Sequence, residues 1–392
     1  MPSSLPRKTP RNPVHRVMTF PFGSFQPPAL THAVAEAVRD QVTPGVAVAV
    51  GRAGTTSSFN FGRLYAPGTA GSPTTQVDEN TIYDLASLTK ALCTSVLAMV
   101  AVARGTLDLR NDIRRWLPHA PAGITPEHLL AHSSGWPAHR KFYSELWPGG
   151  TGPAPALLRD QLMSLLQDTP LQAAPGARTV YSDLGFIALG HILECVFNQP
   201  LDLAFARNVA APLELATLRF GVRARDQDAT APTEQCAWRS KLMLGQVHDQ
   251  NAWAMGGVAG HAGLFGTATE VALLGQSLLR SHADSPAKGD PVKRDVLRYF
   301  WQYRRNTAAT WALGWDRPSQ VGSLAGATID RRAVGHLGFT GCSVWLDPYA
   351  QTVVAMLSNR VHPTVADDPR FRQLRPTVMD AALQDVGYAR LP

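Results

Sequence analysis

The stretch "YDLASLTKAL", residues 83–92, places Ser87 and Lys90 three residues apart at the start of a long apolar run. The run continues to Ala103 and is followed by Gly105, which predicts a buried helix that stops at this glycine. Residues three apart lie on the same face of a helix, so the Ser87 hydroxyl and the Lys90 amine could meet. The pair fits either a nucleophile with a basic neighbour or a polar residue that opens a helix.

A second Ser-x-x-Lys pair, Ser285 and Lys288, shows why the context of each pair matters. Pro286 and Gly289 predict a loop there, and no apolar periodicity follows. We therefore interpret Ser285 as a chance match. A serine hydroxyl is a weak nucleophile until a base removes its proton, and a lysine can be that base only where its pKa is lowered.

The sequence on either side of the Ser87 helix predicts a sheet built from both ends of the chain. The run 30–40 has helical periodicity, the run 43–54 predicts a strand, and 55–64 predicts its hairpin partner. Helical patterns joined by Pro- and Gly-rich loops then continue to about residue 300. The last part predicts four antiparallel strands and a final helix, at 310–317, 331–339, 341–348, 352–360 and 375–386.

These patterns predict one domain of the α/β (α+β) class, preceded by a leader. We expect a flexible Pro- and Arg-rich leader over residues 1–28 and a single domain over 29–392. In that domain an antiparallel sheet is flanked by helices, and a mostly helical lobe, roughly 91–300, is inserted in the sheet lobe. The best-marked helix begins at Thr267 and Glu270, which have the spacing of a capping box.

Composition argues against several classes of function. The formal net charge is +7, but part of it lies in the leader and no basic stripe interleaved with aromatic residues indicates nucleic-acid binding. The longest apolar run is shorter than the about 20 residues that span a bilayer. The leader has no apolar segment typical of a secretory signal, so we expect a cytoplasmic protein. No metal site or disulfide framework is indicated by the spacing of the four cysteines, Cys93, Cys195, Cys236 and Cys342.

Two further motifs follow Ser87 along the chain. "YSD" at 181–183 precedes an apolar helical run, and "HLG" at 336–338 lies on a predicted strand between glycines. The order Ser-x-x-Lys, Tyr-x-Asp, His-x-Gly resembles that of the serine β-lactamase, DD-peptidase and family VIII carboxylesterase superfamily. Within it, the nearer resemblance is to the class C β-lactamase and esterase branch. The resemblance covers about residues 30–390 and includes "LLAHSSGWP" (129–137), "GGVAGHAGLFGTATEVALLGQSLL" (256–279), "ALGWD" (312–316) and "LSNRVHP" (357–363).

The resemblance implies a β-lactamase/DD-peptidase-like fold and a serine hydrolase that forms an acyl-enzyme. Ser87 would be the acylated nucleophile, Lys90 its partner, and Tyr181 the general base that later protonates the leaving group. A cationic Lys90 would lower the pKa of Tyr181 and let a phenolate persist. The oxyanion hole would use the backbone N–H groups of Ser87 and Phe339, and Gly338 would let substrate lie close to the strand.

Two positions depart from the pattern of the antibiotic-destroying members. Asp183 stands where Asn is usual and would favour the protonated form of Lys90. His336 stands where Lys is usual, and a neutral histidine supplies no permanent charge for a substrate carboxylate. We therefore expect ester, amide or cell-wall-peptide-like substrates and weak or no β-lactamase activity. The residues assigned to substrate binding are Asp183, His336, Gly338 and Phe339.

Two other functions remain open at this stage. A non-catalytic, penicillin-binding-like sensor or scaffold would keep the fold, and Asp183 and Leu337 motivate that reading. An acyltransferase would use the same residues as the hydrolase. We expect no cofactor and no metal, and a small ester, amide or peptidoglycan fragment as partner; the natural substrate and the oligomeric state are left open. Loop anchoring, packing or core cover is the default interpretation of His132, His139, His248, His261, Trp136 and Trp253.

Overall fold

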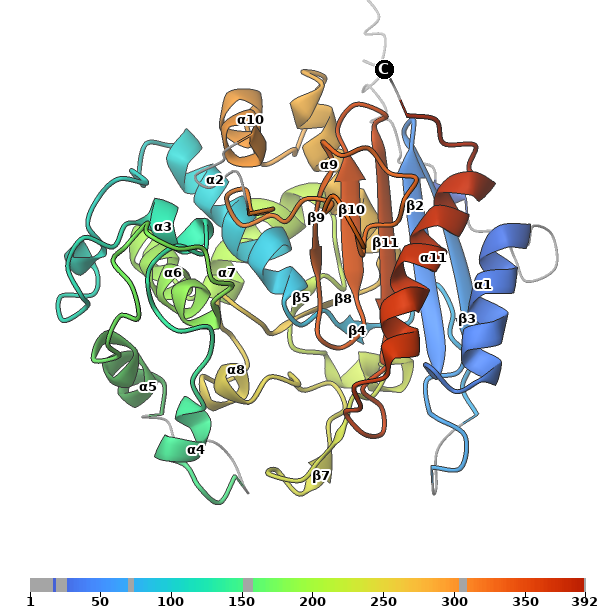
Figure 1. The fold of residues 1–392 in the computed structure, drawn as a ribbon, viewed down its shortest axis with the longest axis horizontal. Coiled ribbons are helices and arrows are strands. Elements are labelled where there is room, and N and C mark those ends of the chain that lie inside the picture. The colour runs from blue at the N-terminus through green and yellow to red at the C-terminus, as the bar shows by residue number, and fades with distance from the viewer. Residues whose placement is uncertain (1–16, 19–26, 70–73, 151–157, 303–308, 391–392) are drawn as a thin grey trace, which may run out of the picture.

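A six-stranded sheet with helices on both faces is the centre of the computed structural model, which describes residues 17–18, 27–69, 74–150, 158–302 and 309–390 (Figure 1). The strand order β1-β3-β2-β11-β10-β9 shows that both ends of the chain contribute to one sheet. The strands are β1 (Val17–Met18), β2 (Gly45–Arg52), β3 (Thr55–Gly62), β9 (Val334–Leu337), β10 (Ser343–Asp347) and β11 (Thr352–Ser358).

The N-terminal hairpin lies in the middle of this sheet. β2 is buried along nearly all of its length and pairs antiparallel with β3 on one side and with β11 on the other. Such continuous burial is expected of an apolar strand covered on both faces. The predicted strands at 43–54 and 55–64 are therefore confirmed. Most of the predicted leader, 1–28, lies outside the described residues, although Val17–Met18 pair parallel with β3.

β9, β10 and β11 confirm three of the four strands predicted near the C-terminus. The prediction of a strand at 310–317 is wrong. Within the described residues, the only β pairing of this segment is an isolated bridge between Asp316 and Gly335. The chain turns at Gly314, whose φ is 77°. A Cβ atom at Gly314 would lie 1.7 Å from the Ser95 hydroxyl oxygen, so the segment is a tight turn against the buried helix.

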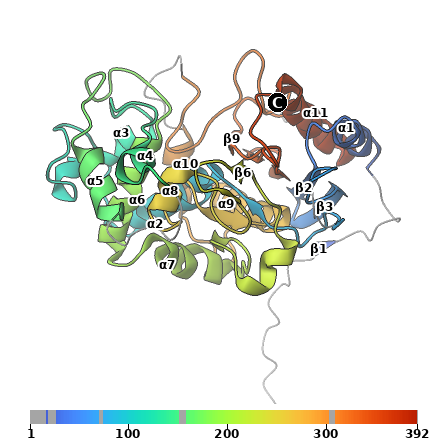
Figure 2. The same cartoon turned by 90° about the horizontal axis from the view of Figure 1, so that it is seen from below.

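Two helices from opposite ends of the chain, α1 (Pro28–Arg39) and α11 (Pro369–Asp385), lie side by side over one face of the sheet (Figures 1 and 2). Their apolar side chains share a core with β2, β10 and β11. The predicted N-terminal helix is confirmed. α11 begins before its predicted start at Arg375, because the Asp368 carboxylate caps it by accepting the Arg370 N–H at 2.8 Å.

α9 (Ala268–His282) covers the opposite face of the sheet, and its first turn confirms half of the predicted capping box. The Thr267 hydroxyl accepts the Glu270 N–H at 3.3 Å, as expected. The Glu270 carboxylate does not return to Thr267. It accepts instead from three backbone N–H groups of the preceding loop, those of Ala216, Thr217 and Leu218.

The buried helix predicted after Ser87 is present as a π-helical segment, Lys90–Ser95, that continues into α2 (Val96–Ala103).

No single helix among the described residues is long and apolar enough to cross a membrane. One bent pair of helices, Asp183–Phe197 with Leu201–Leu213, would be long and apolar enough together, by length and composition only. The remaining helices are α3 (Pro126–Leu130), α4 (Phe142–Leu146), α5 (Leu158–Gln167), α6 (Asp183–Phe197), α7 (Leu201–Phe205), α8 (Gln250–Ala254) and α10 (Arg294–Gln302). Short strands near them are β4 (Tyr83–Asp84), β5 (Arg219–Phe220), β6 (Gln235–Cys236), β7 (Lys241–Leu242) and β8 (Leu264–Gly266).

Candidate active site

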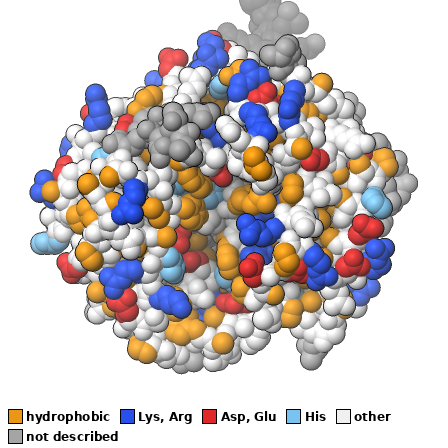
Figure 3. Space-filling model, viewed as in Figure 1, with side chains coloured by type: hydrophobic (Ala, Val, Ile, Leu, Met, Phe, Trp, Pro, Cys, Tyr) orange, Lys and Arg blue, Asp and Glu red, His pale blue; other side chains and the backbone are white. Residues whose placement is uncertain are grey.

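A cavity of about 580 Å³ lies between the helical region and β9, and a hollow is visible near the centre of the face in Figure 3. Its lining brings together all the residues that sequence analysis assigned to the site, except that Lys90 lies behind Ser87 with no exposed surface. Ser285, the chance match, lies in a turn after α9, where its hydroxyl donates to the Arg280 carbonyl. The predicted residues on the lining are Ser87, Tyr181, Asp183, His336, Gly338 and Phe339.

Ser87 lies in the turn that joins β4 to the buried helix. Ala86, just before it, has a φ of 47°, a left-handed conformation that costs a non-glycine residue energy and is common at functional sites. Two hydrogen bonds fix this turn: the Ala86 N–H donates to the Asp84 carboxylate at 2.8 Å, and the Thr89 hydroxyl donates to the Ala86 carbonyl at 2.7 Å. The turn therefore holds Ser87 at the cavity wall at the entrance to the helix.

Lys90 uses its three N–H donors on three different groups. Its Nζ donates to Ser87 Oγ at 3.0 Å and to the His261 carbonyl at 3.0 Å. It also forms an ion pair with Asp183 Oδ1 at 2.7 Å. An ammonium group has three donors, so the buried cation is fully satisfied. The Ser87 hydroxyl is thus bound to a lysine side chain and does not serve as an ordinary helix cap.

Asp183 sets the charge of this cluster. Burial, the largest single influence, lowers the pKa of Lys90, but the charge of Asp183, that of Tyr181 and the hydrogen bonds to both together outweigh it, so the pKa of Lys90 is raised and the amine stays protonated. Burial would raise the pKa of Asp183, but the charge of Lys90, together with the hydrogen bond to His139 and the charge of His261, holds that pKa well below its usual range. The other Asp183 oxygen lies 3.1 Å from Nδ1 of His139. Asp183 is therefore an ionised carboxylate that contacts the Lys90 cation with one oxygen and the His139 imidazole with the other.

Tyr181 faces the same cluster, with Lys90 Nζ at 5.1 Å from the centre of its ring. Burial raises the pKa of Tyr181, and Asp183 adds to the rise. The charge of Lys90 and hydrogen bonding to Ser87 and Lys90 lower that pKa, as the sequence suggested, but do not outweigh burial. Lys90 therefore acts on the Tyr181 pKa in the expected direction, but burial keeps the net pKa raised, so the expectation that a phenolate persists is wrong: in the resting protein the phenol is neutral.

His336 lies on β9 and is buried, with Nδ1 at 2.8 Å from the Leu337 carbonyl oxygen. Burial, followed by the charge of Lys90, lowers the pKa of His336 to about 3. The imidazole is therefore neutral, as the sequence analysis assumed. His336 contributes shape and a polar edge to the cavity and carries no charge.

Gly338 and Phe339 follow β9 at the cavity wall. A Cβ atom at Gly338 would lie 2.6 Å from the Leu85 carbonyl oxygen, so glycine is required here by the turn that holds Ser87. Arg375, on α11, donates to the Gly338 carbonyl at 2.6 Å. Because C=O and N–H of a trans peptide point in opposite directions, this bond fixes the direction of the Phe339 N–H. Neither this N–H nor that of Ser87 donates to another group in the described part of the chain.

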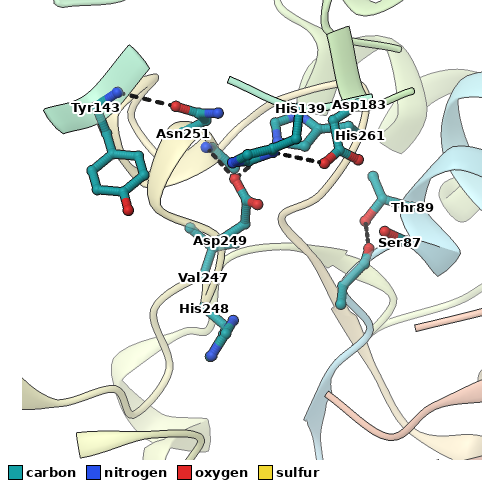
Figure 4. Close-up of polar contacts among 12 residues, drawn as sticks. Ser87, Thr89, His139, Tyr143, Asp183, Val247, His248, Asp249, Asn251 and His261 are labelled. Atoms are coloured by element: carbon teal, nitrogen blue, oxygen red, sulfur yellow. Dashed lines mark hydrogen bonds and ion pairs between the residues drawn. The ribbon is translucent and has the colours of Figure 1, made fainter. Parts of the chain in front are cut away.

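Several residues at the cavity were not assigned to the site from the sequence. Asp249 lies 2.8 Å from His261 Nε2, and His139 reaches Asp183, so two histidines interpreted as loop anchors belong to acid–imidazole pairs beside Ser87 (Figure 4). Arg360 and Arg375 also line the cavity. Trp136 is buried in the core and Trp253 lines a different cavity, and among the described residues no group of acids, histidines and cysteines could hold a metal ion.

Comparison with known proteins agrees with this architecture. A family model described as Beta-lactamase matches residues 30–378. The putative D-alanyl-D-alanine carboxypeptidase of Escherichia coli K12 is 29% identical over 315 residues, which are 73% of this chain and 71% of that protein. The protein of the same description from Salmonella agona is 27% identical over 314 residues, covering 74% of this chain and 71% of its own length.

Solved structures show the same fold at lower identity. EstCE1, described as a hydrolase with promiscuous acyltransferase activity, superposes with a TM-score of 0.71 at 21% identity and covers 90% of this chain and 98% of its own. Simvastatin synthase (LovD) from Aspergillus terreus gives a TM-score of 0.67 at 18% identity, with 92% and 99% coverage. The fold, the order of the motifs and the family match lead to one conclusion: this chain belongs to the Beta-lactamase family.

Proposed function

We propose that this chain is a serine hydrolase that acts through an acyl-enzyme on Ser87. The observation that carries the proposal is the bond between Lys90 Nζ and Ser87 Oγ, 3.0 Å long, at the wall of a cavity large enough for a small substrate. A nucleophile in reach of a polarising cation and of a phenol fits acyl transfer. The proposed substrates are esters, amides or cell-wall-peptide-like molecules.

In the proposed acylation step, Ser87 Oγ attacks the substrate carbonyl and gives its proton to the Tyr181 phenolate. The phenolate is the minority form, because the pKa of Tyr181 is raised, and the Lys90 cation stabilises it. The negative oxygen of the tetrahedral intermediate is held by the N–H groups of Ser87 and Phe339. When the carbon–leaving-group bond breaks, Tyr181 returns the proton to the leaving group, and water then releases the acyl group in a second, equivalent step.

Two features support weak or no β-lactamase activity. His336 is neutral, so β9 offers no cation to a β-lactam carboxylate. The ion pair of Lys90 with Asp183, 2.7 Å long, keeps the amine protonated and so removes it as a base. Acyl transfer to an alcohol or amine is a second candidate, because an acyl-enzyme can be intercepted by any nucleophile that enters the cavity, and the structural neighbour EstCE1 is described as having acyltransferase activity. A non-catalytic sensor is the third.

The test is covalent labelling followed by turnover. Wild-type protein incubated with a fluorophosphonate is expected to gain one adduct, mapped to Ser87 by peptide mass spectrometry, and to hydrolyse p-nitrophenyl acetate. Ser87→Ala is expected to lose both, because the nucleophile is gone. Ser285→Ala, which changes the serine of the other Ser-x-x-Lys pair, is the matched control and is expected to keep both.

Each outcome separates the candidates. Full turnover by Ser87→Ala would contradict the assignment of the nucleophile. A folded wild-type protein that forms no adduct with a fluorophosphonate or a penicillin would favour the sensor. A product ratio that shifts toward ester or amide as alcohol or amine is added would identify an acyltransferase, and a penicillin that is turned over quickly would contradict the weak β-lactamase activity.

A further inference from the structure

His139 is a cavity histidine that has no part in the acylation step. It lies in the loop between α3 and α4, and its side chain, 41% exposed, lines the cavity. The backbone is tied down on both sides of it. The Ala138 carbonyl accepts the Asp183 N–H at 2.8 Å, and the Arg140 carbonyl accepts from the Asn251 side chain at 2.8 Å. The imidazole is therefore held at a fixed place on the cavity wall, although it comes from a loop.

The contact with Asp183 determines which ring nitrogen of His139 carries the proton. Nδ1 lies 3.1 Å from Asp183 Oδ2 (Figure 4). Asp183 is ionised, and an ionised carboxylate only accepts hydrogen bonds, so Nδ1 is the donor. In the neutral imidazole the lone pair is then on Nε2. No described residue is bonded to Nε2, so this nitrogen is available to a molecule in the cavity.

Neighbouring groups are less able to take a proton from a molecule that enters the cavity. Lys90 is already a cation, and Tyr181 is a neutral phenol. Nε2 is buried in both His248 and His336, although both residues line the cavity. Burial also lowers the pKa of His336 to about 3, which makes its imidazole a weak base. His139 differs from them because it combines an unbonded ring nitrogen with access to the cavity.

We propose that His139, oriented by Asp183, is the general base of deacylation: its Nε2 takes the proton of the water or alcohol that attacks the acyl group on Ser87. This proposal rests on the proposed function of Ser87 and specifies the base of its second step. It also gives a function to the carboxylate at position 183, where asparagine is usual. A carboxylate orients the imidazole as an amide would, and in addition its charge stabilises the imidazolium that forms.

Each proton in this step has a donor and an acceptor. The oxygen of water or alcohol bonds to the acyl carbon, and its proton passes to Nε2 of His139. The carbon–Oγ bond of the tetrahedral intermediate then breaks, the Tyr181 phenol gives its proton to Ser87 Oγ, and the acid or ester product leaves. Tyr181 suits this role because its raised pKa keeps the phenol protonated in the acyl-enzyme. The imidazolium loses its proton to bulk water, and the remaining phenolate is the form that the next acylation uses.

The experiment measures acylation and deacylation separately in wild type and in His139→Gln. Glutamine can still donate a hydrogen bond to Asp183 but has no basic nitrogen. Rapid mixing with p-nitrophenyl acetate gives the acylation rate from the release of p-nitrophenolate, and intact-mass spectrometry of quenched samples gives the decay of acetyl-Ser87. The variant is expected to acylate at close to the wild-type rate and to deacylate roughly 100-fold more slowly, as expected for loss of a general base. Acetyl-Ser87 therefore accumulates, and kcat falls while kcat/KM is unchanged.

His191→Gln is the matched control, because His191 is also a partly exposed imidazole near a carboxylate, that of Glu194 at 4.0 Å, but is not on the cavity lining. It is expected to keep both rates. Equal decay of acetyl-Ser87 in wild type and His139→Gln would overturn the proposal, and so would an equal loss of acylation and deacylation, which indicates a structural role. Absence of any acyl or fluorophosphonate adduct on Ser87 in both proteins would overturn the proposed function, and this base with it.

A second measurement follows the decay of acetyl-Ser87 against pH. The hydrogen bond to Asp183, with the charges of Asp183 and Asp249, raises the pKa of His139, although burial and the charge of Lys90 oppose the rise. A general base acts in its neutral form, so the wild-type deacylation rate is expected to rise with pH through this raised pKa. Asp183→Asn keeps an acceptor for Nδ1 without the charge and is expected to move the rise to lower pH. The same rise in His139→Gln as in wild type would overturn the proposal.

Discussion

Asp183 lies 2.7 Å from Lys90, and this ion pair governs the protonation of the groups around Ser87. The same carboxylate raises the pKa of Lys90 and adds to the rise in the pKa of Tyr181. Below its pKa the base form of either group is only a minority, and a raised pKa makes that minority smaller at neutral pH. The pair therefore stabilises the buried cation and at the same time restricts base catalysis at neutral pH.

Replacing Asp183 by Asn is expected to move the pH–rate profile of ester hydrolysis to lower pH. Removal of the negative charge lowers the pKa of both Lys90 and Tyr181, so the base form is reached sooner. Where the rate is limited by a base below its pKa, each unit of downward shift raises kcat/KM at pH 7 by about tenfold. The measurement is kcat/KM for p-nitrophenyl acetate across about pH 6 to 9.

The same substitution is expected to lower stability, because it leaves the Lys90 cation buried without its counter-ion, a change that typically costs about 3–5 kcal/mol. Urea unfolding of the two proteins at pH 7 measures this loss. Asp249→Asn is the control for position, because Asp249 lines the same cavity but pairs with His261. An Asp183→Asn profile that coincides with wild type would show that neither Lys90 nor Tyr181 limits the rate.

Arg375→Met is expected to lower kcat for a neutral ester by roughly 10- to 100-fold while KM changes little. The guanidinium holds the Gly338 carbonyl at 2.6 Å and so directs the Phe339 N–H of the same peptide. Loss of an oriented oxyanion donor acts on the transition state and leaves ground-state binding nearly unchanged. Steady-state kinetics with the methyl ester of 3-acetoxybenzoate separate the two parameters.

Two variants test whether this effect comes from positioning. Arg375→Lys keeps a cation and is expected to retain part of kcat. Arg372→Met removes an exposed arginine from the same helix and is expected to match wild type. A loss shared equally between kcat and KM, with a lower unfolding midpoint, would instead indicate a purely structural role for Arg375.

His336→Gln is expected to reduce the loss of stability on acidification. The folded pKa of His336 is about 3, below the value of about 6.5 in an unfolded chain, so between these values the unfolded state binds the extra proton. This contribution to stability is present at pH 7 and is lost as pH falls below about 6.5. Between pH 7 and 4.5 it amounts to about 2–3 kcal/mol.

Urea unfolding at both pH values measures the effect, and the quantity compared is the change in unfolding free energy between them. Wild type is expected to lose more than His336→Gln over this interval. His119→Gln, which alters an exposed histidine, should behave as wild type does. Equal losses for wild type and His336→Gln would mean that His336 is protonated in the folded protein.

The fold was largely predictable because its signals are local. A Val-rich run closed by turn residues marks β2, and a run of apolar residues after Lys90 marks the central helix. The prediction of a strand at 310–317 failed because the composition of this segment matches a strand, whereas its backbone is fixed by contact between Gly314 and the distant Ser95. Periodicity carries no information about such a contact.

The candidate site was predictable only where motifs mark it. The three motifs bring Ser87, Tyr181 and His336 to one cavity. Arg375 lies in a segment predicted only to be helical, and its partner Gly338 is 37 residues away, so no spacing rule connects them. The direction in which the pKa of Tyr181 shifts also depends on how deeply the phenol is buried, and the sequence alone does not give that depth.

The central pairing of β2 with β11 has a consequence for biosynthesis. Residues from Arg52 to Val46 pair with Thr352 to Ser358, so the partners are about 300 positions apart in the chain. At about 5–20 residues per second, a ribosome needs roughly 15–60 s to make the intervening segment. Throughout that interval the nascent hairpin has one unpaired edge, which is open to aggregation or to a chaperone. The last fifth of the chain must leave the ribosome before the sheet can close.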